Sequence, residues 1–194
     1  METITLQCHE KDMPQVRTWV KQACKDLHQG QAHDCIWSCG QADQIQVGDR
    51  IFLQRIGKPP IGYFASGYVL EAPPTAQLRH TDPAYRGLSL AYHQQSSVPA
   101  DYRVCLQLDA ILNFDQPLKI RTLQQLSRFQ GCNFARLGQG TAFDPAYTDF
   151  LEDEWRNHST EVARLGRGAR LIDTYCAQGA DLVRSKQFED AYNL

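Results

Sequence analysis

The stretch GDRIFLQRIGKPPIGYFASGYV, residues 48–69, sets the expected fold. Two runs rich in apolar residues flank a Gly-Lys-Pro-Pro segment, and two prolines cannot sit inside a paired central strand. The pattern therefore predicts a β-hairpin with Ile51 and Leu53 on one face of its first arm and Phe52 on the other.

The second arm is unusual because small residues interrupt its aromatics: Gly62, Ala65, Ser66 and Gly67. A strand built only for a core would carry bulkier, branched side chains at these positions. Small residues also let a planar ring approach the backbone. We therefore expect these positions to leave space beside Phe64 for a planar guest.

Signals on both sides of the hairpin add further strands and helices. Strands are expected at residues 3–8 and 101–112, and helices at 13–30, 122–130 and 144–158. Most of the expected strands are joined without helices. The order therefore predicts an α+β fold with a mixed or antiparallel sheet, curled into a small β-barrel of about five to six strands flanked by helices.

The length of 194 residues suggests one domain with an appended segment. We expect a binding domain at residues 1–157. The glycine-containing remainder, 158–194, is expected to be a helical terminal segment or a linker to an effector domain that this chain lacks.

Charge is distributed unevenly along the chain, although the net charge is only −2. Residues 50–140 carry ten Lys/Arg against five Asp/Glu, whereas both flanks are acidic. A basic middle fits a local polyanion-binding face, and it also fits a mixed, solvated surface.

The sequence predicts a cytoplasmic protein without a membrane partner. It contains no apolar run of transmembrane length, and its first residues are polar rather than signal-like. Its seven cysteines are an odd number, which argues against a disulfide framework.

Catalytic and metal-binding patterns are weak. His33, Cys35 and Cys39 have no second cluster that would complete a four-ligand zinc site. No nucleophile elbow, phosphate loop or nuclease motif is recognisable. We therefore assign no catalytic residue, metal or cofactor and leave the enzyme question open, with Cys39 and Cys132 as candidate reactive thiols.

Aromatic residues then offer a binding interpretation. They fall in expected strands and turns near small residues and arginines, as nucleobase-stacking rings do, although for any single one of them a core role is favoured. The set is Trp37, Tyr63, Phe64, Tyr68, Tyr92 and Phe134.

Two blocks of sequence resemble a known family. The first runs from WSCG at residues 37–40 through the VGDRIFL and FASG motifs to Gly67. The second combines LQLDAILN (106–113), a following QPL, GCNFARLGQG (131–140) and a helix ending at Trp155. Together they resemble the EVE-like domains of the PUA superfamily found N-terminal to HNH nuclease domains in modification-dependent restriction endonucleases. The resemblance covers roughly residues 30–157.

The resemblance implies a PUA-like (EVE-like) barrel and a task. The family binds double-stranded DNA carrying a modified base, most often 5-methylcytosine or a related cytosine, by flipping that base into an aromatic pocket. It also implies an HNH nuclease domain in the full-length protein. An RNA-binding PUA-like module for modified RNA is the alternative.

Site residues follow from this resemblance. Trp37 and Phe134 are expected to wall the base pocket, with Phe64 as a third wall. The base edge would be read by Ser66, by Asn133 and by the backbone at Ser38 and Ala65. The DNA phosphates would be held by Arg55, Lys58 and Arg136, with Arg79 and Arg86 in the long loop as groove contacts.

Overall fold

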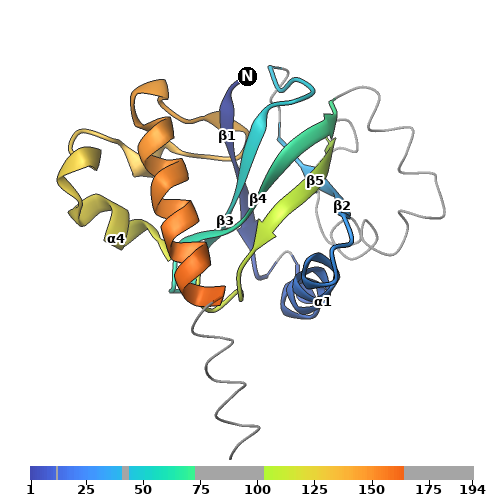
Figure 1. Cartoon of the computed structure of the whole chain (residues 1–194). Coiled ribbons are helices and arrows are strands. Elements are labelled where there is room, and N and C mark those ends of the chain that lie inside the picture. Colours follow the sequence, from blue (N-terminus) through green and yellow to red (C-terminus); the bar gives the residue numbers. More distant parts are fainter. Residues whose placement is uncertain (12, 41–43, 73–102, 164–194) are drawn as a thin grey trace, which may run out of the picture. The chain divides into compact units, whose positions relative to one another are not determined.

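The structure is a computed structural model of the whole chain, and it describes residues 1–11, 13–40, 44–72 and 103–163 (Figure 1). The chain divides into two compact units, Met1–Arg156 and Asn157–Leu194. The second unit is described only over residues 157–163. The roles predicted for the two sides of residue 157 stay predictions.

A mixed seven-stranded sheet forms the centre of the first unit. Its strands are β1 (Thr3–His9), β2 (His33–Ser38), β3 (Arg50–Ile56), β4 (Gly62–Glu71), β5 (Arg103–Ile111), β6 (Leu118–Lys119) and β7 (Thr141–Ala142). They follow the order β2-β5-β4-β3-β1-β7, and β6 pairs with β4. β1 and β3 are parallel, and the other pairs are antiparallel.

This sheet confirms the predicted α+β class and corrects the strand count. The short β6 and β7 were not predicted, because two-residue strands leave no alternating pattern. Within the described residues the strand order ends at β2 and β7, which do not pair with each other, so the sheet does not close into a barrel.

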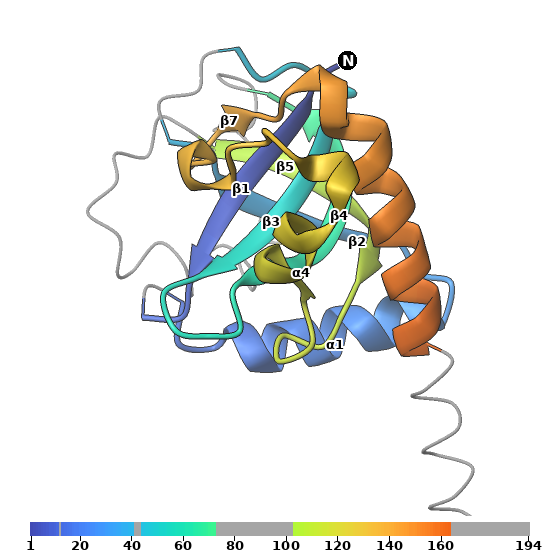
Figure 2. The same ribbon diagram turned by 90° about the vertical axis from the view of Figure 1, so that its left-hand side faces the viewer.

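Helices cover both sides of the sheet. They are α1 (Val16–His28), α4 (Ile120–Gln125), the 3-10 turns η2 (Ser127–Phe129) and η3 (Phe134–Arg136), and a helix over residues 145–163. Figure 1 shows α1 on one side of the sheet and α4 on the other. Figure 2 shows α4 in front of β3 and β4.

The predicted hairpin is confirmed and its side chains alternate. Pairing of β3 with β4 runs from Arg50 opposite Tyr68 to Arg55 opposite Gly62. Ile51 and Leu53 join the core cluster that includes α1 residues. Phe52 belongs to the opposite side, where its ring lies 5.7 Å from the ring of Trp155.

The small residues of β4 have a different explanation from the predicted opening. A Cβ at Gly67 would lie 2.3 Å from the carbonyl oxygen of Gln107, and one at Gly62 would lie 2.3 Å from that of Leu118. The glycines therefore let β5 and β6 approach β4 closely. The space beside Phe64 is filled, since this fully buried ring packs against Phe114.

Candidate nucleic-acid interface

Two predicted pocket walls lie in the core. Trp37 is 2% exposed, and its ring centroid is 5.6 Å from that of Trp19 on α1. Phe64 is fully buried, with its centroid 5.0 Å from that of Phe114. Trp37 therefore stabilises the packing of the sheet against α1, and Phe64 stabilises the packing of β4 against the segment after β5.

Phe134, the other predicted wall, belongs to a separate aromatic group. Its ring lies 5.7 Å from Phe129 and 6.1 Å from Phe143, outside the core cluster that holds Trp37 and Phe64. The structure therefore does not bring Trp37 and Phe134 face to face. Their parts in a base pocket stay predictions.

Ser66 belongs to a partly buried network around Arg50. Its hydroxyl donates to Oδ1 of Asp109 at 2.5 Å, and Oδ2 of Asp109 accepts from Nη1 of Arg50 at 2.7 Å. Arg50 also donates to Glu152 at 2.6 Å and to the carbonyl of Gly67 at 3.2 Å. Ser66 thus stabilises the centre of the sheet, as does the neighbouring, fully buried Ala65.

Sequence reasoning missed the structural role of Arg50. Its carboxylate partners stand 59 and 102 residues away in the chain, so no local charge pattern announces them. The only sequence signal is its place inside a hairpin arm, where an arginine between apolar residues must find buried partners.

Ser38 does lie beside the second sequence block. The side-chain amide of Gln139 donates through Nε2 to the carbonyl of Ser38 and accepts through Oε1 from the backbone N–H of Gln7 at 2.6 Å. Gln7 donates in turn through Nε2 to the carbonyl of Leu137 at 2.9 Å. We call Gln7, Ser38 and Gln139 the polar seam.

The polar seam brings the two ends of the strand order together through side chains. Gln7 lies in β1, next to β7, whereas Ser38 ends β2 at the far end of the sheet. Trp37 borders the seam, because its indole Nε1 donates to the carbonyl of Gln7 at 3.3 Å. Gln7 and Gln139 are only half-buried, so ligand access is possible here.

Asn133 is exposed at the start of the same block. Its Oδ1 accepts from the backbone N–H of Ala135 at 3.2 Å and caps the η3 turn. Among the described residues its amide nitrogen has no hydrogen-bond partner, so it can still donate two hydrogen bonds. This fits the predicted amide reader without testing it.

The predicted phosphate ligands have different surroundings. Arg55 is 3% exposed and donates to the carbonyl of Phe114 at 2.8 Å and to Asp115 at 2.9 Å, so it acts as a core ion-pair residue. Lys58 and Arg136 are exposed. Arg79 and Arg86 lie outside the described residues.

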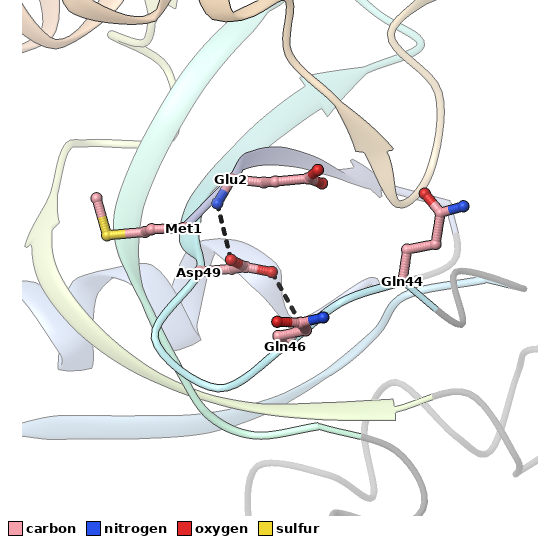
Figure 3. Close-up of a pocket in the computed structure, with 5 residues that line it drawn as sticks. All are labelled: Met1, Glu2, Gln44, Gln46 and Asp49. Atoms are coloured by element: carbon pink, nitrogen blue, oxygen red, sulfur yellow. Dashed lines mark hydrogen bonds between the residues drawn. The ribbon is translucent and has the colours of Figure 1, made fainter.

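A polar pocket of about 480 Å³ opens beside the start of β1 (Figure 3). Asp49, 3% exposed, accepts the backbone N–H groups of Glu2 and Gln46, both at 2.8 Å. In Figure 3 the side chain of Glu2 extends toward that of Gln44. No described lining residue is aromatic, so the pocket offers hydrogen bonds without a stacking surface.

The thiols lack the properties of nucleophiles. Burial, reinforced by the charge of Asp144, raises the pKa of Cys132 to about 11. Burial likewise raises the pKa of Cys39 to about 11. Both thiols are therefore protonated at neutral pH, unlike a catalytic thiolate.

The described residues hold neither a grouped metal-ligand set nor a membrane helix. No cluster of three or more His, Cys, Asp or Glu side chains there is arranged to hold a metal ion. His33 is paired with Asp26, through its Nδ1 at 3.0 Å. No described helix has the length and apolar character needed to cross a membrane.

Comparison with known proteins gives only remote structural likenesses. No family model and no curated protein matches the chain. A hypothetical protein from Leishmania major aligns with a TM-score of 0.45 and 13% identity, over 81% of this chain and 96% of its own. A Pseudomonas syringae protein aligns with a TM-score of 0.42 and 14% identity, over 78% of this chain and 99% of its own. A Pseudomonas putida protein aligns with a TM-score of 0.43 and 12% identity, over 78% of this chain and 98% of its own. These values are too low to assign fold family or function.

Proposed function

We propose that residues 1–157 form a PUA-like module that recognises a modified base, 5-methylcytosine or a related cytosine, in double-stranded DNA. One observation supports this most: Gln139 hydrogen-bonds to Ser38, 101 residues earlier. The two blocks that resemble the recognition segments of EVE-like domains are therefore in contact at the polar seam.

The seam carries suitable chemistry for reading a base edge. Amide side chains both donate and accept hydrogen bonds, and three of them are supplied by Gln7, Gln139 and, at the start of the same sequence block, Asn133. A base turned out of the duplex loses its pairing partner, at a cost of a few kcal/mol, and must regain hydrogen bonds and stacking in the protein.

Recognition of one methyl group sets the expected discrimination. Burying a methyl contributes about 0.8 kcal/mol, which corresponds to roughly fourfold in affinity. Larger ratios require a site that leaves a void around the unmodified base. In the full-length protein the cutting chemistry would come from an HNH nuclease domain.

Fluorescence anisotropy with the wild-type chain tests the proposal. Duplexes of identical sequence, methylated or unmodified at cytosine, are compared, with matched single-stranded RNA as competitor. Tighter binding of the methylated duplex by about fourfold or more supports the proposal. Equal binding of both duplexes contradicts it, and preferential binding of the RNA favours the RNA-binding module, since a 2′-hydroxyl contact distinguishes the two.

A further inference from the structure

Three exposed cations gather around the β3–β4 turn. Lys58 lies in the turn itself, whereas Lys119 and Arg121 flank Ile120 at the start of α4. The backbone of Lys119 stands opposite Gly62 in the pairing of β6 with β4, and the N–H of Ile120 donates to the carbonyl of Ile61 at 3.1 Å. We call Lys58, Lys119 and Arg121 the basic edge.

The cations of the basic edge are not neutralised within the described residues. Lys58, Lys119 and Arg121 have no ion pair there. Carboxylates do pair with several other described arginines: Arg17, Arg50, Arg55, Arg128 and Arg156. The basic edge therefore keeps its full positive charge.

The carboxylates linked to this turn do not cancel that charge. Arg55 donates to the carbonyl of Pro59 in the turn at 3.5 Å and pairs with Asp115 and, at 3.7 Å, with Glu10. Arg17 pairs with the same two carboxylates. Two arginines thus balance two acids, and the local excess is the +3 of the basic edge.

The backbone that presents the basic edge is held from both sides. β6 pairs with β4, and Arg55 binds the turn from within the core. A Cβ at Gly57 would lie 2.6 Å from Nε2 of His9, so the turn also packs tightly against the end of β1. Cations on such a fixed frame are pre-organised for anions spaced along a polymer.

We propose that the basic edge binds the phosphate backbone of duplex DNA independently of base modification. This inference rests on the proposed DNA-binding function and adds two cations, Lys119 and Arg121, to the phosphate ligands expected from the sequence. It also transfers the role expected of the buried Arg55 to exposed side chains. Each phosphate contact releases counterions, so binding must weaken steeply with salt.

The test compares two lysine pairs on an unmodified, fluorescein-labelled duplex. Lys58→Gln/Lys119→Gln removes two cations from the basic edge, and Lys21→Gln/Lys25→Gln removes two exposed cations from α1. Affinity is measured against NaCl concentration, and urea unfolding checks that both variants fold. The slope of log affinity against log salt should fall by about 1.8 for the first pair and stay at the wild-type value for the second.

Between about 50 and about 200 mM NaCl, the affinity of the wild type for the duplex should therefore fall by a factor about 12 times larger than that of the Lys58→Gln/Lys119→Gln variant. Adding Arg121→Gln should lower the slope by a further ~0.9. An unchanged slope in the first pair, an equal fall in the α1 pair, or no duplex binding by the wild type overturns the inference. If the wild type shows no preference for the methylated duplex but the basic-edge variant still shows the reduced salt slope, only the proposed base recognition is contradicted.

Discussion

Arg50 shows how a single side chain connects distant parts of the chain. Its guanidinium binds Asp109 on β5 and Glu152 on the helix that begins at residue 145, and it lies 4.6 Å from the centre of the Tyr68 ring. Replacing Arg50 removes its charged hydrogen bonds to Asp109 and Glu152, whose side chains are 42% and 27% exposed, so the cost is that of the lost hydrogen bonds and not of a stranded buried charge.

We predict that Arg50→Met lowers the free energy of unfolding by about 1.5 kcal/mol. The exposed Arg136→Met serves as the matched control and should change it by no more than about 0.5 kcal/mol. Urea denaturation followed by circular dichroism measures both. Equal effects of the two substitutions would contradict the network role of Arg50.

Cys132 gives a pH-dependent prediction at the same scale. Its pKa is raised from 9.0 to about 11, first by burial and then by the charge of Asp144. The folded state therefore favours the protonated thiol. The stability this provides is fully present below pH 9.0, and it is lost as pH rises toward about 11.

The free energy of unfolding should accordingly decline across this alkaline range, and the decline should be shallower in Cys132→Ser. As an independent check, iodoacetamide should label Cys132 more slowly in the folded than in the urea-unfolded chain, because the thiolate is the reactive form. Labelling at the unfolded rate would show that the folded state does not disfavour the thiolate, contrary to this account.

Among the elements, β4 depends on close backbone approach. Gly67→Ala places a Cβ against the backbone of β5 and should destabilise the fold by about 3 kcal/mol. Gly30→Ala meets no atom within 4 Å but has φ +72°, so it should cost only about 1 kcal/mol. Thermal and urea unfolding compare the two, and a smaller effect at Gly67 would mean that β5 can shift away.

Asp115, in the segment between β5 and β6, is paired with two elements, and this pairing predicts a response to acid. Arg17 of α1, followed by Arg55 of β3, lowers the pKa of Asp115 below 3.8. The stability from this ion pairing is therefore present above the unfolded pKa and is lost as pH falls below it. Asp115→Asn should flatten the stability profile in that acidic range, and an unchanged profile would contradict the arginine pairing.

The elements also show what sequence patterns can predict. Alternation in residues 50–56 placed Ile51 and Leu53 opposite Phe52, because a strand has a period of two. The same pattern could not separate a core ring from a stacking ring. Trp37 is buried in the core cluster, where α1 supplies Trp19 against it.

Sequence patterns did not predict the surroundings of single residues whose neighbours are remote in the chain. Arg55 has the composition of a phosphate ligand, yet its position is set by Glu10 and Asp115, 45 residues before it and 60 after it. The two glycines of β4 were explained by a guest, whereas neighbouring strands account for them. Tertiary contacts decided both cases, and local sequence carries no record of them.

For the whole molecule, the polar seam is the central feature. It connects β1 and the end of β2, which are separated by three strands in the sheet order, through the amide of Gln139. The sheet therefore brings its two ends together without pairing them in the described residues. Its position beside both sequence blocks makes it the place where base recognition is proposed.

The most direct test measures the ratio of affinities for methylated and unmodified duplexes in Gln139→Ala, with the exposed Gln125→Ala of α4 as control. Circular dichroism confirms that both variants are folded. The account predicts a wild-type ratio of about four or more, kept by Gln125→Ala and reduced toward one by Gln139→Ala. A ratio that Gln139→Ala leaves at the wild-type value, or a wild-type ratio of one, would contradict it.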